Sequence, residues 1–116
     1  MVNEIVLHDV LYSALSGDLT KEALLIYARR YSEGGTIDQL LGDFAVFVCR
    51  HFLAHDISFH EANGALNVIM PTVGHEQAPA PFWEAYVAFE DFELSRDPDH
   101  EARPRVEDAL RALGAV

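Results

Sequence analysis

The chain has 116 residues, half of them hydrophobic and 23% charged, with a formal net charge of −11. That length suits one domain over residues 1–116, and the apolar fraction suffices for a core. The excess of acids excludes nucleic acid and anionic membranes as natural partners, because both carry the same sign of charge. One cysteine, Cys49, excludes an intramolecular disulfide, and we expect it to be a small buried hydrophobic residue.

The first two predicted helices cover residues 3–16 and 20–32. Apolar side chains recur at helical spacing in both: Leu7, Leu11 and Ala14 in the first, and Leu24, Ala28 and Tyr31 in the second. Asn3 is a candidate N-cap, and Gly17 is a candidate C-terminal stop. Two short amphipathic helices are therefore expected before the glycine pair that follows residue 32.

The third predicted helix is the longest and covers residues 37–55. Thr36 and Gln39 have the spacing of a capping box at its start. Apolar residues occupy most of its circumference, which is typical of a central, buried helix. Gly42 in its interior costs about 1 kcal/mol relative to alanine, and its presence predicts a close crossing with another helix.

The fourth predicted helix follows a second capping box, formed by Ser58 and Glu61. Its stripe consists of four apolar residues: Phe59, Ala62, Leu66 and Ile69. Pro71 is expected to end or kink it, because proline lacks the N–H that continues a helix. Asn63 and Asn67 lie four residues apart on this helix, which favours a polar contact with another helix.

The last part of the chain is predicted to hold two helices, residues 81–94 and a final one from Pro104 to Gly114, joined by an acidic loop. Residues 71–81 form a proline-rich connection. No run of alternating β-branched residues stands between turn signals, so strands are not expected. The predicted fold class is all-α, a single-domain bundle of five or six helices around the central helix at 37–55.

The most distinctive segment lies between Pro81 and Glu101. It contains five aromatic residues and seven carboxylates but only one cation, Arg96. Three of the aromatics are expected in the core, whereas Trp83 and Phe92 fall at its edge, where interface aromatics are common. The candidate partner-binding residues are Trp83, Glu84, Glu90, Asp91, Phe92, Glu93, Asp97, Asp99 and Glu101. The alternative interpretation is a solvated acidic surface.

Histidines offer two weaker chemical patterns. His51 and His55 are spaced to share one helix face, as a zinc pair requires, with Asp56, His60 or Glu61 as a third ligand. The same two histidines also continue the core stripe, and we predict no metal or cofactor.

A second pattern is His75-Glu76 in the proline-rich loop, a minimal acid–base pair. No nucleophile elbow or phosphate-binding loop accompanies it, so an enzyme is not expected.

A resemblance covers about a third of the chain, in the pattern ISFHEANGALNVIM…APFWEAYVAFEDFE. It carries a Ser-aromatic-x-Glu-Ala helix start with a Leu-Asn pair, then a Pro-aromatic pair and an acidic helix. These features resemble small acidic helical bacterial proteins, some of which are immunity proteins of polymorphic or contact-dependent toxin systems. The resemblance implies a toxin-neutralising role and supplies no catalytic residue.

Charge and resemblance together predict an immunity or inhibitor protein that binds a basic partner, such as a nuclease toxin, through its acidic face. A homo-oligomeric scaffold that buries Trp83 and Phe92 in a homodimer is a second possibility. A metal-binding or enzymatic module built on His51, His55 or His75 is a third. The N-terminal residues lack the pattern of a secretory signal, and the longest apolar run is too short for a bilayer, so a cytoplasmic location is expected.

Overall fold

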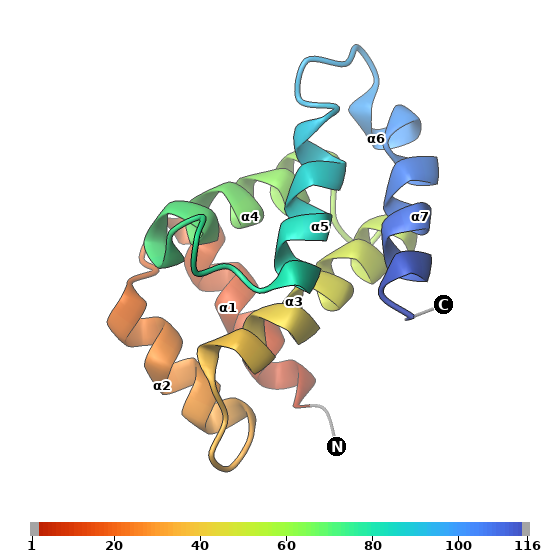
Figure 1. The fold of residues 1–116 in the computed structure, drawn as a ribbon. Helices are drawn as coiled ribbons and strands as arrows, with labels where there is room; N and C mark the ends of the chain where they lie inside the picture. Colours follow the sequence, from red (N-terminus) through yellow and green to blue (C-terminus); the bar gives the residue numbers. More distant parts are fainter. Residues whose placement is uncertain (1–2, 115–116) are drawn as a thin grey trace.

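The computed structural model describes residues 3–114 and confirms the all-helical prediction (Figure 1). Within these residues the chain forms seven α-helices and no strand. Their bounds are α1 Glu4–Ser16, α2 Lys21–Tyr31, α3 Ile37–Leu53, α4 Phe59–Val73, α5 Ala80–Glu90, α6 Pro98–Glu101 and α7 Arg103–Ala112. None of these helices combines the length and the apolar character that a bilayer-spanning segment requires.

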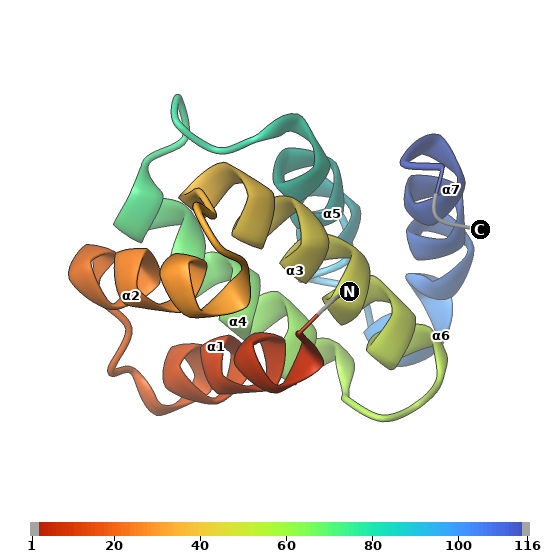
Figure 2. The same ribbon diagram turned by 90° about the horizontal axis from the view of Figure 1, so that it is seen from below.

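α3 is the central helix, as its apolar circumference predicts. It packs against α1, α2, α4, α5 and α7, and the other helices surround it in both views (Figures 1 and 2). Its largest side chains, including Leu41, Phe44 and Phe52, are fully or almost fully buried. Cys49 is also buried, and burial raises the pKa of its thiol to about 12. The thiol therefore stays protonated near neutral pH and behaves as a core residue.

Polar caps fix where several helices begin. Ser58 Oγ accepts from the backbone N–H of Glu61 at 3.1 Å, and the Glu61 carboxylate accepts from the N–H of Ser58 at 3.0 Å. This complete capping box confirms the predicted start of α4. At α3 Thr36 does cap the helix, but the Gln39 side chain accepts from Ser32 Oγ instead of closing the box.

The end of α3 differs from the prediction, because the helix stops at Leu53 and not at His55. The guanidinium of Arg103, at the start of α7, donates to the carbonyls of Phe52 and Leu53 and lies over the Phe52 ring. His55 has a φ of 65°, in the left-handed region. Arg103 thus satisfies carbonyls that a further helical turn would have used.

α5 is shorter than predicted, and α6 was not foreseen. α5 ends at Glu90, and residues 91–94 continue as tight turns in which Phe92 N–H donates to the carbonyl of Phe89 at 3.0 Å. α6 lies in the stretch predicted as an acidic loop, with Pro98 in its first turn. A single helical turn falls below the length at which an apolar stripe becomes visible in sequence.

Pro71 and Gly42 perturb their helices less than the sequence predicts. α4 does not end at Pro71 but continues to Val73, where the N–H of Gly74 closes it on the carbonyl of Met70. Gly42 does face another helix, since a Cβ there would lie 3.9 Å from Pro81 at the start of α5. That distance is ordinary van der Waals contact, so the crossing of α3 and α5 leaves room for a methyl group.

Candidate functional site

The exposed aromatic surface of α5 is a cluster of three rings. Trp83, the only tryptophan of the chain, is 40% exposed and stacks on Tyr86 with ring centroids 5.7 Å apart. His75, from the loop after α4, meets Trp83 at 5.7 Å and Tyr86 at 6.1 Å, edge-on in both cases. Sequence reasoning treated His75 as half of an acid–base pair and missed that it packs on the aromatic surface. We call His75, Trp83 and Tyr86 the ring cluster.

Tyr86 connects the ring cluster to the carboxylates. Burial raises the pKa of Tyr86, and its hydrogen bond with Glu90 and the nearby charges of Glu90 and Glu93 raise it further. The phenol therefore remains protonated and keeps donating to Glu90. Glu90 Oε2 is shielded from solvent and has no hydrogen-bond partner among the described residues. Glu90 is thus half-buried and is an unusual member of an acidic surface.

Glu93 is the hydrogen-bond partner of Asn63 and Asn67, the two asparagines for which the sequence predicts a polar contact. Its Oε1 accepts from Asn63 Nδ2 and from Asn67 Nδ2, both at 2.9 Å. The two asparagines do form a polar contact, but with the turn after α5 and not with another helix as predicted. Because one oxygen of Glu93 is occupied by these amides, the side chain is less free to meet a partner than its exposure suggests.

Asp99 also serves the fold. Its Oδ1 accepts from the backbone N–H of Phe59 at 2.8 Å, at the first position of α4. This N–H has no partner within the helix, and a carboxylate there also suits the helix dipole. Glu101 folds back toward the N–H of Asp97 at 3.4 Å, a long contact within α6. Asp99 is therefore a long-range cap for α4, which residue spacing could not reveal.

The remaining candidates differ in their exposure. Glu84, Asp91 and Asp97 are exposed, whereas Phe92 is half-buried and packs against the core. Asp91 lies 4.0 Å from the guanidinium of Arg105 on α7, at a solvent-exposed position where such pairs contribute little. Glu84 and Asp97 are therefore the least constrained carboxylates of the segment.

The candidates occupy two sides of α5. Trp83, Tyr86 and Glu90 recur at three- and four-residue spacing on the side that adjoins α4 and His75. Glu84 and Asp91 are seven residues apart on the side that adjoins Arg105, about 100° round the helix from Trp83 and Glu90. The turn and loop that follow project at one end of the molecule, at the top of Figure 1. We call residues 82–101 the acidic end.

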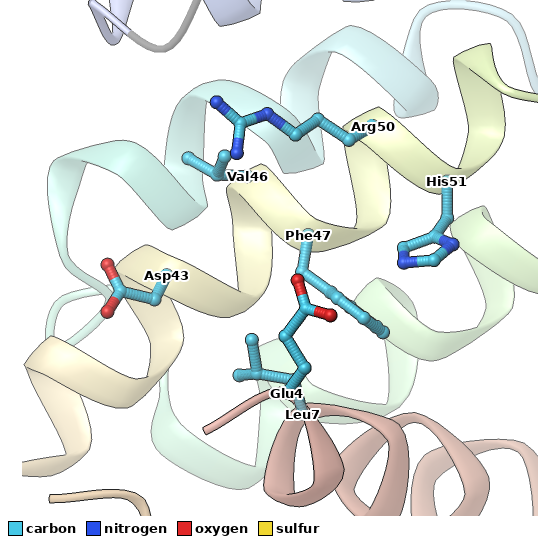
Figure 3. Close-up of a pocket in the computed structure, with 7 residues that line it drawn as sticks. All are labelled: Glu4, Leu7, Asp43, Val46, Phe47, Arg50 and His51. Atoms are coloured by element: carbon cyan, nitrogen blue, oxygen red, sulfur yellow. The ribbon is translucent and has the colours of Figure 1, made fainter. Parts of the chain in front are cut away.

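A second candidate site is a hollow of about 190 Å³ between α1 and α3 (Figure 3). Charged and apolar side chains line it together: Glu4, Leu7, Asp43, Val46, Phe47, Arg50 and His51. Tyr31 donates to Asp43 at 2.6 Å, and His51 Nδ1 bonds Asp56 at 2.8 Å. Asp43 and His51 therefore already have hydrogen-bond partners within the chain.

The predicted sharing of one helix face by His51 and His55 is wrong. α3 ends before His55, whose left-handed backbone takes it off the helix, while His51 bonds Asp56 and stacks on Phe47. No group of three or more His, Cys, Asp or Glu residues within 3–114 is arranged to hold a metal ion. His51 therefore has contacts within the fold, and His55 lies off the helix.

Comparisons of the chain with protein-family models, curated proteins and solved structures found no match. A proposal about function therefore has to come from the residues and their geometry.

Proposed function

We propose that the protein binds a basic protein partner through the acidic end and acts as an immunity or inhibitor protein. The observation that carries the proposal is the partly exposed Trp83, stacked on Tyr86 and flanked by carboxylates, of which Asp91 has a 4.0 Å ion pair with Arg105. Tryptophan is enriched among the residues that dominate interface energies, and charge of one sign selects a partner of the other.

The charge distribution supports a basic partner. Residues 82–101 carry seven acids and one base, and the ion pair found there, between Asp91 and Arg105, is 4.0 Å long. A field of this sign accelerates encounter with a cationic surface and is weakened by salt. The exposed Glu84 and Asp97 are the carboxylates best placed to contact cationic side chains directly.

The ring cluster supports persistent binding once the partner has arrived. Tryptophan and tyrosine faces attract guanidinium and ammonium groups, by about 0.5–2 kcal/mol according to their exposure. His75 holds Trp83 and Tyr86 edge-on, so the aromatic surface is ordered before binding. A preformed surface loses less conformational entropy when the partner binds.

The inhibitory role follows from what such a surface would cover. An acidic flank can occupy the basic cleft of a nuclease or similar toxin in place of the phosphates of its substrate. The resemblance of residues 57–93 to acidic helical immunity proteins points to the same class. A cytoplasmic location suits this role, because an immunity protein meets its toxin where the substrate is.

Growth rescue tests the proposal. Each toxin domain encoded beside the gene of this protein is expressed in bacteria with the wild-type chain, and growth is measured. We expect one pair to survive, and the triple variant Glu84→Lys, Asp91→Lys, Asp97→Lys to lose protection. The control Glu22→Lys, Glu33→Lys, Asp38→Lys changes net charge equally on exposed residues of another region. Failure of every pair, or equal protection by both triple variants, would contradict the proposal.

A further inference from the structure

α1 exposes an apolar stripe on the face opposite the core. Ile5 is 71% exposed, Tyr12 74% and Leu15 44%, and the exposed His8 lies between the first two. The opposite face of α1 is buried through Val6, Leu7, Val10, Leu11 and Ala14. This 13-residue helix has apolar side chains on both faces, and one of these faces is left uncovered by the residues that the structure describes, 3–114.

The spacing of this stripe is that of a helix-packing seam. Ile5, Tyr12 and Leu15 follow each other by seven and three residues, the spacing of positions that meet a neighbouring helix in a coiled coil. His8, between Ile5 and Tyr12, packs its ring against Phe47 and His51 of α3. Ten residues of helix separate Ile5 from Leu15, or about 15 Å of continuous face. Such a face is suited to receive another helix.

α2 packs beside α1 and is joined to it by polar contacts. Of the seven large apolar side chains that are exposed within residues 3–114, five lie on α1 and α2, including Leu25 and Ile26. Asp9 and Arg30 form an ion pair of 2.9 Å between the two helices, and Ser13 bonds Tyr27 at 2.6 Å. We call the exposed stripe of Ile5, Tyr12 and Leu15, on the helix that α2 supports, the α1–α2 face.

Charge indicates what covers this face. Residues 3–32 hold four acids and three bases, a net charge of −1, whereas residues 33–116 hold fifteen acids and five bases, a net charge of −10. A basic partner is attracted to the second region and has no electrostatic reason to choose the first. A second copy of this acidic chain is repelled almost everywhere and least of all at the α1–α2 face.

We propose that the protein forms a homodimer through the α1–α2 face, with α1 of each copy packed on α1 of the other about a two-fold axis. Such an interface is self-complementary, so Ile5, Tyr12 and Leu15 are buried against the same stripe of the second copy. α3 lies between α1 and α5 in Figure 2, so the acidic end of each copy remains open. One short helix pair lies at the low end of interface sizes, where weak and transient associations are found.

Sedimentation equilibrium of the full chain from about 1 µM to about 500 µM, a range in which weak dimers become populated, tests this dimer. We expect the mean mass to rise from that of the 12.9 kDa chain toward twice that value. The double variant Ile5→Glu, Tyr12→Glu should stay monomeric over the whole range. The control Trp83→Glu, Leu94→Glu adds the same charge at two exposed apolar positions elsewhere and should dimerise like the wild type.

Three results would overturn the dimer: a wild-type chain that stays monomeric, an Ile5→Glu, Tyr12→Glu variant that dimerises normally, or a dimer broken by the control variant instead. Circular dichroism checks that each variant keeps its helices. If the double glutamate variant loses them, Tyr12→Ala with Leu15→Ala makes the same test without added charge, and a tenfold or greater weakening of the dimer is then expected.

Discussion

The acidic end and the α1–α2 face are two exposed surfaces with opposite character. The acidic end has seven acids, one base and an ordered ring cluster, whereas the α1–α2 face has large apolar side chains and nearly balanced charge. Because salt screens charge but not apolar contact, binding at the two surfaces should respond differently to ionic strength. A chain of net charge −11 can in this way attract an unlike partner and still associate with itself.

The number of carboxylates in the acidic end overstates how many of them are available to contact a partner. Glu93 accepts from two asparagine amides, Asp99 caps α4 and Glu90 is half-buried beside Tyr86. Glu93 joins the turn after α5 to α4, Asp99 joins α6 to α4, and Glu90 lies beside Tyr86 on α5 itself. Glu84 and Asp97 have the clearest freedom to meet a partner.

Among single substitutions, the largest expected effect is on peptide dissociation, and it separates the two surfaces by their aromatic residues. Trp83→Ala should speed dissociation of a nona-arginine peptide about tenfold, through loss of the cation–π surface, and leave the association rate nearly unchanged. Surface plasmon resonance with the immobilised peptide measures both rates. Tyr12→Ala is the control on the α1–α2 face and should leave both rates unchanged. Equal effects of the two substitutions would remove the distinction between the surfaces.

Within the acidic end, Asp99 and Asp97 should differ in their contribution to stability. Asp99→Ala leaves the first N–H of α4 without its carboxylate and should lower the free energy of unfolding by about 1–2 kcal/mol. Asp97→Ala removes an exposed carboxylate and should change the free energy of unfolding by less than about 0.5 kcal/mol. Urea unfolding followed by circular dichroism measures both. Two equal losses would contradict the structural role of Asp99.

Glu93 and Glu84 form a second matched pair with a smaller expected difference. Glu93→Ala removes the acceptor of Asn63 and Asn67 and should cost about 0.5–1 kcal/mol, since both bonds are exposed to solvent. Glu84→Ala should leave the unfolding free energy unchanged and slow the arrival of the nona-arginine peptide. If Glu84→Ala destabilises the protein as much as Glu93→Ala, the division between structural and free carboxylates is wrong.

The smallest expected effect is on how the free energy of unfolding depends on pH at alkaline values. The pKa of Tyr86 is raised in the folded state, so the unfolded chain loses this proton first, near pH 10, and binds fewer protons than the folded one. The contribution of Tyr86 to stability is therefore complete below about pH 10 and is lost as the pH rises further. Tyr86→Phe should reduce the fall in urea stability between about pH 9 and about pH 11. Tyr12→Phe, at an exposed position, is the control.

Sequence reasoning succeeded where local chemistry decides structure. The capping residues Thr36 and Ser58, the stripe that ends in Ile69, and the C-terminal Gly17 all lie where their spacing predicts. The apolar circumference of residues 37–53 correctly identified the central helix. These features depend on neighbours within one or two turns, which is the range that a single sequence reveals.

It failed where distant residues decide structure. Arg103 is fifty residues away from the helix end that it caps, and Asp99 is forty residues away from Phe59. The packing of His75 on Trp83 likewise depends on how the loop after α4 folds back. The exposed stripe of α1 was also missed, because its core stripe of Leu7, Leu11 and Ala14 already accounted for the helix.

Stopped-flow fluorescence of Trp83 tests most directly whether the acidic end is the surface that attracts a basic partner. The association rate with the nona-arginine peptide is measured at about 20 mM salt, where screening is weak, for the wild type and both triple lysine variants. We predict a fall of about thirtyfold or more for Glu84→Lys, Asp91→Lys, Asp97→Lys. The control Glu22→Lys, Glu33→Lys, Asp38→Lys should lose a few-fold at most, and equal falls for the two variants of equal charge would contradict a localised acidic site.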